Sequence, residues 1–363
     1  MDIEHFGGKG DGKTDNALVL TRLSDASTAR AVKAGLPPML CVIFDAGIYE
    51  FSSTWSYALP EALRSAVIIE GAGSGATILR FESDSGLNFT LHHPKQTLHM
   101  RGLTLVTNTS SGSGAALKIT QTSCLGSFDQ STFSDITFEG LSGGQFWGVG
   151  ADVVGLSGTA WHAVTAYGDT SFQHGIGIRI RGNNIDCGET NGYSIYHNIT
   201  SGIFNQLSKG VVYDDFTQGI TVTQSNFQNS QFGIWSPPET RGQNMQLNVS
   251  NSQFQVSDQA ISLNSPINLG SYSNNTVLIS SGKVGFSLGS SNINTVSGNT
   301  FAGVNYGSTP SAVGIDVSGT ATMIAGNSFS ALRCGYRFHP NALAGGSSAN
   351  TFNATSPACS DRH

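Results

Sequence analysis

One phrase recurs between Gly175 and Phe352, and it limits the chain to a repetitive architecture. The phrase opens on glycine or alanine and continues with alternating apolar residues. Its starts are 33, 23, 27, 25, 29 and 21 residues apart, at Gly177, Gly210, Gly233, Ala260, Gly285, Gly314 and Gly335. A spacing mostly in the twenties is typical of solenoids, in which each repeat packs only on its neighbours.

A second phrase keeps the same period and consists of a small polar pair that ends in phenylalanine. It occurs at 225–227, 252–254, 299–301, 327–329 and 350–352. The gap between Phe254 and Phe301 is doubled, and Asn274-Asn275-Thr276-Val277 fills it. Two registered phrases with one period make an internal repeat, and they predict a solenoid.

The composition favours strands over helices in this solenoid. Charged residues make up 12% of the chain, about half the usual fraction of roughly 25%. Serine, threonine and asparagine take the place of lysine and glutamate, which are strong helix formers. With 45 glycines and 10 prolines, the chain suits many short strands joined by tight turns.

Charge, hydropathy and cysteine count exclude several classes. The net charge of −6 argues against a nucleic-acid partner, because phosphate binding needs a clustered positive surface. No segment reaches the roughly 18 apolar residues of a membrane span, so no membrane partner is expected. Five cysteines without a CxxC pair argue against a zinc site. Cys334 and Cys359 either close a C-terminal loop or are separate buried thiols.

The first 50 residues differ from the repeat. Ala17 to Lys33 has the pattern of an amphipathic helix, capped by one of the three residues before it, and its apolar side contains Leu18, Leu20, Leu23, Ala29 and Val32. The segment 42–49, Val-Ile-Phe-Asp-Ala-Gly-Ile-Tyr, predicts a strand that ends in a turn.

Two segments of this region resemble a known family. Residues 5–16 read His-Phe-Gly-Gly-Lys-Gly-Asp-Gly-Lys-Thr-Asp-Asn. Together with 42–49 they resemble the N-terminal cap of the pectate-lyase-like β-helix superfamily, whose phrase is D-F-G-A-x-G-D-G-x-T-D-D and then V-x-h-P-x-G-x-Y, with h apolar. The chain departs from that phrase at His5, Asn16 and Asp45. The superfamily includes pectate lyases, polygalacturonase-type glycosidases and phage tailspike depolymerases.

The resemblance implies an all-β fold, a single-stranded right-handed parallel β-helix with an N-terminal capping helix. A helix over the open end hides unpaired strand edges and the apolar core. We expect one domain over residues 1–363, with a cap region at 1–50, coils at about 60–352 and a C-terminal tail at 353–363.

The alternation of the first phrase predicts a functional face. In a β-strand, alternate side chains point into the core and out to solvent. Arg181, Val212, Asp214 and Trp235 should therefore point outward. Equivalent positions on neighbouring coils are roughly 4.8 Å apart, so Arg181 and Asp214 should be vertical neighbours, with Val212 and Trp235 stacked beside them.

The turns that follow this column differ in length and should form a groove. The long turns 182–191 and 236–242 flank the short turn 215–218, and functional residues tend to lie on such loops over a rigid scaffold. We expect Asp214, Asp215 and Glu239 to be catalytic. The residues expected to contact substrate are Arg181, Asp186, Glu189, Tyr193, Trp235 and Arg241, with Trp235 and Tyr193 as sugar-stacking platforms.

The chemistry rests on carboxylates held close together, because one pKa is then raised and an acid and a base coexist at one pH. Asp214-Asp215 resembles the Asp-Asp pair of polygalacturonase-type relatives. The Asn-Thr-Asp, Gly-His-Gly and Arg-Ile-Lys phrases that accompany that pair are missing, and the nearest match, His174-Gly175, precedes it. The alternative is structural: Asp214 pairs with Arg181 across coils and Asp215 is a turn residue.

The leading expectation is an extracellular enzyme that hydrolyses a polysaccharide without a cofactor or metal. One alternative is a polysaccharide lyase acting by β-elimination on a uronic-acid polymer, or a C5-epimerase, with Arg181, Arg241 or Lys209 near the substrate and Ca²⁺ held by clustered aspartates. Another is a non-catalytic glycan-binding module of adhesin or tailspike type. The expected location is secreted or periplasmic, after removal of a leader peptide, and the expected state is a monomer or a homotrimer.

Overall fold

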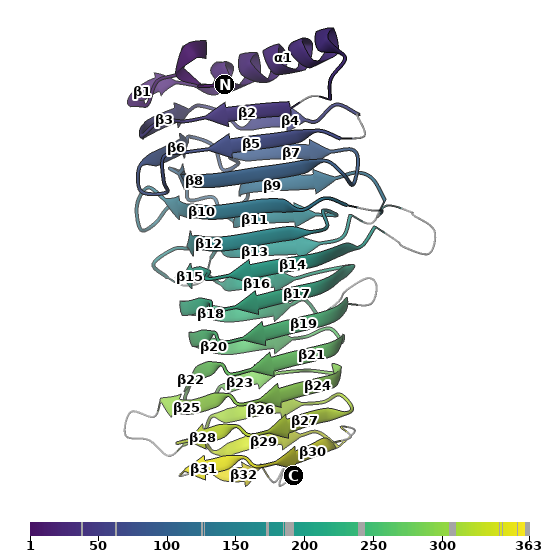
Figure 1. Ribbon diagram of the computed structural model, residues 1–363. Helices are drawn as coiled ribbons and strands as arrows, with labels where there is room; N and C mark the ends of the chain where they lie inside the picture. Colours follow the sequence, from purple (N-terminus) through teal and green to yellow (C-terminus); the bar gives the residue numbers. More distant parts are fainter. Residues whose placement is uncertain are drawn as a thin grey trace.

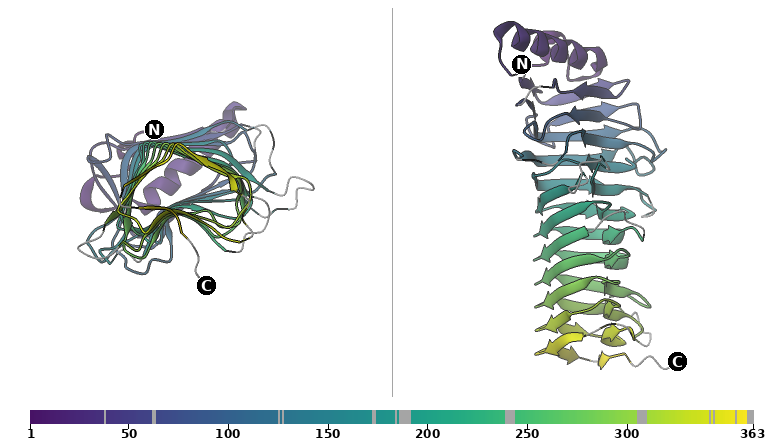
Figure 2. Two further views of the ribbon diagram at one scale, coloured as in Figure 1. Left: turned by 90° about the horizontal axis from the view of Figure 1, so that it is seen from below. Right: turned by 90° about the vertical axis from the view of Figure 1, so that its right-hand side faces the viewer.

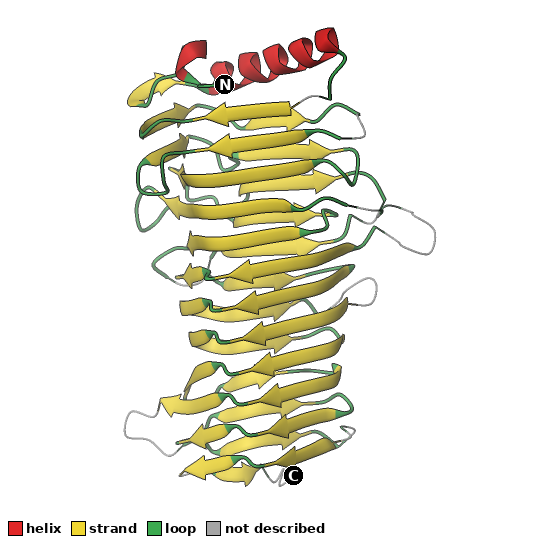
Figure 3. Ribbon diagram, viewed as in Figure 1, coloured by secondary structure: helices red, strands yellow, loops and turns green. Residues whose placement is uncertain are grey.

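The computed structural model describes residues 1–37, 39–61, 64–124, 126, 128–171, 174–183, 185, 192–238, 244–304, 310–340, 342, 344–353 and 355–359. They form one right-handed parallel β-helix of about 11 turns with a helix near the N-terminus (Figure 1). The predicted fold class is thus confirmed. Viewed by secondary structure, α-helix occurs only at the N-terminal end of the described chain (Figure 3).

Each coil contributes strands to three faces, and every strand pairs in parallel with the equivalent strand of the next coil. Face 1 contains β2 (Met39–Ile43), β5 (Ala66–Glu70), the first parts of β8 (Thr97–Thr107), β10 (Ser131–Gly140) and β12 (Thr159–Tyr167), then β14 (Ser194–Thr200), β17 (Thr217–Thr223), β19 (Asn244–Ser250), β21 (Ile267–Ser273), β24 (Asn292–Ser297), β27 (Thr322–Ala325) and β30 (Ala344–Ser348). Face 2 contains β1 (Asp11–Asp15), β3 (Gly47–Phe51), β6 (Thr77–Phe81), the second parts of β8, β10 and β12, β15 (Ile203–Asn205), the first parts of β18 (Asn226–Ser236) and β20 (Gln253–Leu263), then β22 (Thr276–Ser280), β25 (Thr300–Val304), β28 (Ser328–Ser330) and β31 (Thr351–Asn353). Face 3 contains β4 (Trp55–Ala58), β7 (Leu87–Leu91), β9 (Ala115–Gln121), β11 (Val149–Val154), β13 (Ile176–Arg181), β16 (Lys209–Tyr213), the second parts of β18 and β20, then β23 (Val284–Ser287), β26 (Val313–Val317), β29 (Cys334–Phe338) and β32 (Ser356–Ala358).

The two sequence phrases meet in the core. Phe204, Phe227 and Phe254 stack on successive coils of face 2, with ring centroids 4.9 and 4.7 Å apart. A Cβ atom added to Gly177 or Gly210 would lie 2.5 Å from the Phe204 or Phe227 ring, respectively. In these two coils the corner before face 3 therefore requires glycine, because a phenylalanine ring occupies the space that a side chain would need.

A buried asparagine ladder holds the lower coils together at the turn into face 2. The side-chain amide of Asn275 donates to Oδ1 of Asn299 at 2.9 Å, and the amide of Asn299 donates to Oδ1 of Asn327 at 2.9 Å. The same Oδ1 atoms accept the backbone N–H of Asn275 and Asn299, each at 2.9 Å. The small polar residue of the second phrase thus satisfies backbone groups inside the stack.

The helix α1 (Ala17–Ala34) lies across the N-terminal end of the coil, after the short 3₁₀ helix η1 (Glu4–Phe6) (Figure 2). The Asp15 carboxylate accepts the N–H of Ala17 at 3.0 Å and so caps the helix. Leu18 and Ala29, which the sequence pattern assigned to the apolar side, are exposed. The side that packs on the coil contains Val19, Leu20, Leu23, Ser27 and Ala31, which are all buried. The Ser27 hydroxyl on this side donates to the Met39 carbonyl of the first coil.

The cysteines resolve the alternative left open by the sequence. Cys334 and Cys359 form a disulfide that joins β29 to the last described residues. Cys124 is also disulfide-bonded, and Cys41 is a free thiol.

Among the described residues, no helix is both long enough and apolar enough to cross a membrane.

His197 makes the stability of the coil depend on pH. Its ring is fully buried on β14, with Nδ1 2.8 Å from the Thr159 hydroxyl and Nε2 3.0 Å from the Ser194 hydroxyl. Burial lowers the pKa of His197 from 6.5 to about 3, and hydrogen bonding at Ser194 offsets only part of this shift. Below pH 6.5 the unfolded chain takes up a proton at this position that the folded chain refuses until pH falls to about 3.

We therefore expect the free energy of unfolding to fall by about 2 kcal/mol between pH 7 and pH 5 through His197 alone. Equilibrium denaturation at the two pH values measures this loss. In His197→Gln, which keeps a polar side chain but does not titrate, the loss should be smaller by that amount. Equal losses in the wild type and the variant would contradict the prediction.

Candidate functional site

The outward column of face 3 has the predicted order. In parallel register, Arg179 pairs with Val212 and Val212 pairs with Trp235. Asp214 follows β16 directly, and its N–H donates to the Ile180 carbonyl at 3.0 Å, which places it beside Arg181. The alternate residues Ile178, Ile180, Val211, Tyr213 and Ile234 are buried, as the pattern predicted.

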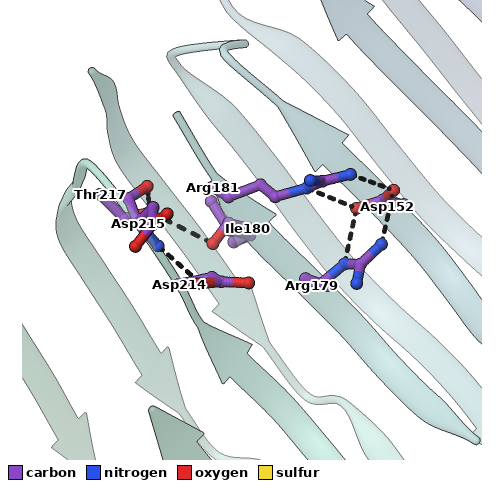
Figure 4. Close-up of polar contacts among 7 residues, drawn as sticks. All are labelled: Asp152, Arg179, Ile180, Arg181, Asp214, Asp215 and Thr217. Atoms are coloured by element: carbon purple, nitrogen blue, oxygen red, sulfur yellow. Dashed lines mark hydrogen bonds and ion pairs between the residues drawn. The ribbon is translucent and has the colours of Figure 1, made fainter. Parts of the chain in front are cut away.

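Asp152, which the sequence analysis did not single out, organises this site. It lies on β11, one coil before Arg179, and its side chain is almost fully buried. Its Oδ1 and Oδ2 atoms accept from Nε and Nη2 of Arg179, both at 2.9 Å, and Oδ2 also accepts from Nη2 of Arg181 at 3.0 Å (Figure 4). Burial acts to raise the pKa of Asp152, but the hydrogen bonds and charges of Arg179 and Arg181 outweigh it and lower the pKa.

The predicted alternative, an ion pair between Arg181 and Asp214, is wrong. Arg181 reaches to Asp152 on the preceding coil instead of Asp214 on the following one. The reason is that a buried carboxylate needs compensating charge more than a half-buried one does. Asp214 is left without an ion pair in the part of the chain that the structure describes, and its Oδ1 accepts the N–H of Asp215 at 2.8 Å.

Asp214 still lies within the electrostatic reach of Arg179. Burial would lower the pKa of Arg179, but the hydrogen bond and charge of Asp152, and after them the charge of Asp214, raise it. Asp214 is therefore a half-buried carboxylate beside cations that are already engaged elsewhere. Such a group remains able to bind a proton donor or a ligand hydroxyl.

The short turn after Asp214 has a fixed backbone. The Asp215 carbonyl accepts the N–H of Gly182 at 2.7 Å and the Thr217 hydroxyl at 3.3 Å. The next residue, Phe216, adopts a left-handed conformation with φ of 52°. These contacts tie the turn to the preceding coil and hold Asp214 and Asp215 at the corner between faces 3 and 1.

Trp235 lies one coil below Val212 and is paired with a lysine. The Lys209 ammonium lies over its ring, 4.5 Å from the ring centroid. Val212 points outward in the register, but its side chain is covered and contributes no exposed surface beside the indole. Burial lowers the pKa of Lys209 from its ordinary value.

Tyr193 precedes β14 and lies against the Asp214 turn. Its ring is half-buried and meets the Phe216 ring edge to face, with centroids 5.5 Å apart. The ring is thus held in place beside the carboxylates. Its use as a sugar-stacking platform stays a prediction.

Four predicted site residues, Asp186, Glu189, Glu239 and Arg241, lie outside the described residues. Within the described ranges, no group of three or more His, Cys, Asp or Glu side chains could hold a metal ion.

His174 lies at the corner between faces 2 and 3. Its His-Gly step resembles the family phrase only in composition. Its Nδ1 is 3.0 Å from Oδ2 of Asp169, and its ring stacks on Phe146 with centroids 5.1 Å apart. The described contacts of His174 are with this corner and not with Asp214 or Asp215.

Comparison with known proteins tests the fold. No family model and no curated protein matches the chain. Among solved structures, the Streptococcus pneumoniae surface protein and adhesin PfbA is similar, with a TM-score of 0.64 and 13% identity over 99% of this chain and 98% of that one. DFA-IIIase from Arthrobacter chlorophenolicus has a TM-score of 0.59 and 14% identity over 97% and 94% of the two chains. The A-module of the Azotobacter vinelandii mannuronan C-5 epimerase AlgE4 has a TM-score of 0.51 and 14% identity over 99% and 97%. The chain thus has the right-handed parallel β-helix fold of the pectate-lyase-like proteins.

Proposed function

We propose that the chain is a glycoside hydrolase that binds a polysaccharide along face 3 and cleaves it with the carboxyl groups of Asp214 and Asp215. One observation carries the proposal. Asp152 engages both Arg179 and Arg181, and this leaves the Asp214 carboxylate beside them without an ion pair among the described residues. The ion pair with Arg181 that the structural alternative predicts does not form, because Arg181 contacts Asp152 instead.

Each step of hydrolysis has a group to perform it. One carboxyl group donates a proton to the glycosidic oxygen, and the other carboxylate removes a proton from the water that attacks the anomeric carbon. Sugar rings stack on Trp235, and Lys209 holds its indole in place. Hydroxyl groups of the substrate accept hydrogen bonds from the N–H groups of Arg179 and Arg181 that Asp152 does not engage. The open flank of a β-helix suits a long polymer.

Incubation with a panel of neutral and acidic polysaccharides tests this function. Hydrolysis releases reducing ends without an unsaturated product, whereas β-elimination releases reducing ends together with the ultraviolet absorbance of a new carbon–carbon double bond. Retained glycan binding without any turnover would overturn the enzyme proposal and favour a binding module. PfbA is described as an adhesin, so that outcome has a structural precedent.

A second candidate, β-elimination or C5-epimerisation of a uronic-acid polymer, is favoured by Lys209. Both reactions begin with removal of a proton next to a carboxyl group, and a lysine with a lowered pKa is able to act as the base. The two guanidinium groups at Asp152 carry one net positive charge that would neutralise the uronate.

Lys209→Met separates the two candidates, because methionine keeps the apolar stem over Trp235 and removes the ammonium. If hydrolysis by Asp214 and Asp215 is correct, kcat should change less than about tenfold and KM should rise, since only sugar stacking is affected. Loss of kcat by about 10²–10⁴-fold would instead identify Lys209 as the base. Steady-state kinetics on the polymer found by the panel give the answer.

The disulfides support a location outside the reducing cytosol. Cys334–Cys359 closes the C-terminal coil, and Cys124 is also oxidised. Disulfides form and persist in secreted and periplasmic proteins. We propose that the chain works on extracellular or periplasmic polysaccharide.

A further inference from the structure

The lower part of face 1 is free of charge. Its seven strands, β14, β17, β19, β21, β24, β27 and β30, contain no Asp, Glu, Lys or Arg, and their one histidine, His197, is buried. They follow one another down the stack in Figure 1. The whole chain contains 18 basic and 24 acidic residues, so a run of seven strands without any of them is a distinct surface.

The outward positions of this surface form ladders of small uncharged polar side chains. Two columns are in parallel register from coil to coil, and the members of both are Asn198, Thr221, Asn248, Ser271 and Thr295, then Thr200, Thr223, Ser250, Ser273 and Ser297. Coils are roughly 4.8 Å apart, so the ladders make a flat, regular array. Every hydroxyl and amide group in it is able both to donate and to accept hydrogen bonds.

Exposed apolar side chains accompany the ladders on the same strands. The exposed fractions are 60% for Tyr196, 39% for Leu269, 57% for Ile293 and 50% for Met323. Tyr196, Leu269 and Ile293 adopt left-handed conformations with φ of 60°, 66° and 55°. For a β-branched residue such as Ile293 this conformation costs about 1 kcal/mol, and burial in the core does not compensate for it because the side chain points to solvent.

From these observations we infer that the lower part of face 1, the outward surface of these seven strands, is an interface between copies of this chain. Protein interfaces are depleted of charge at their centres and enriched in Tyr and Met. The rest of the chain carries a net charge of −6, so two copies repel each other except across an uncharged face. The polar ladders, whose groups are able both to donate and to accept, are complementary to a copy of themselves, whereas a charged partner would find no counter-charge there.

The area of this surface is close to what a stable association needs. The seven strands contain 43 residues, and each residue occupies roughly 3.3 Å along its strand and 4.8 Å across it. The projected area is thus about 680 Å² before side-chain relief is counted, against about 800 Å² per partner in a standard interface. The inference concerns assembly and does not depend on the chemistry proposed for face 3.

Sedimentation equilibrium of the whole chain at tens of micromolar tests the interface. The wild type should have the mass of a dimer or trimer. Asn248→Lys and Thr295→Lys each place a charge at an exposed position in the centre of the surface, and each should weaken association at least tenfold. Gln255→Lys, at an exposed position on face 2, is the matched control and should leave the mass unchanged.

Circular dichroism and the thermal midpoint of dilute samples check that the variants are folded, as expected for exposed positions. A monomeric wild type would overturn the inference. An oligomer that resists both face 1 substitutions, or that dissociates equally with Gln255→Lys, would also overturn it, because association would then occur through another surface or through none in particular.

Discussion

Asp214→Asn is expected to lower kcat by about 10²–10⁴-fold, the usual contribution of a general acid or base. The amide keeps the shape of the side chain and its acceptor for the Asp215 N–H, which lies 2.8 Å away. It cannot exchange a proton at neutral pH. Because Asp214 makes no ion pair with the described residues, the thermal midpoint should change little. Asp215→Asn should have a similar effect on kcat.

Asp258→Asn is the matched control for these substitutions. Its carboxylate, on a partly exposed part of β20, lies 3.1 Å from the ammonium of Lys283. Losing an exposed ion pair of this kind costs about 0–1 kcal/mol and should leave kcat intact. Unaltered kcat in both Asp214→Asn and Asp215→Asn would place the reaction elsewhere, and the corner with Asp169, His174 and Phe146 would be the next region to test.

Asn299→Ala should cause a large loss of stability in the lower coils. It removes the acceptor of the Asn275 amide and backbone N–H and the donors to the Tyr272 carbonyl and Asn327. Buried polar groups left without partners cost about 1–3 kcal/mol each, and relaxation recovers part of the sum. We expect the free energy of unfolding to fall by about 3 kcal/mol or more.

Thermal and chemical denaturation measure this loss, and Thr300→Ala provides the comparison. Thr300 is the next residue, and its side chain is exposed on β25. Its replacement should change stability by less than about 1 kcal/mol. Similar values for the two variants would show that the asparagine ladder contributes little to the stack.

The fold could be predicted because both repeated phrases result from one contact, between the glycine of the first phrase and the phenylalanine ring of the second. Gly177 and Phe204 are spaced as they are because the glycine leaves room for the ring in the next coil. Such a contact recurs at Gly210, Gly233, Gly285, Gly314 and Gly335, and it imposes its period on the sequence. The alternation of Ile178 and Ile180 with Arg179 and Arg181 follows from the same strand geometry.

The site could be predicted only in part, because alternation gives the direction of a side chain but not its partner. Arg181 has coils on both sides, and the buried Asp152 decided which one it contacts. A signal for Asp152 was present: Gly150-Ala151-Asp152-Val153 is another copy of the first phrase, 27 residues before Gly177. The irregular tract around it hid that copy. The pairing of Lys209 with Trp235 depends on rotamers that no spacing specifies.

A crystal structure of Asp214→Asn with a bound oligosaccharide, cut from the polymer that the wild type degrades, tests the central claim most directly. We expect a sugar ring stacked on Trp235, hydroxyl groups within hydrogen-bond distance of Arg179 or Arg181, and a glycosidic oxygen beside position 214. An oligosaccharide bound on face 1, or at the corner formed by Phe146 and His174, would contradict it.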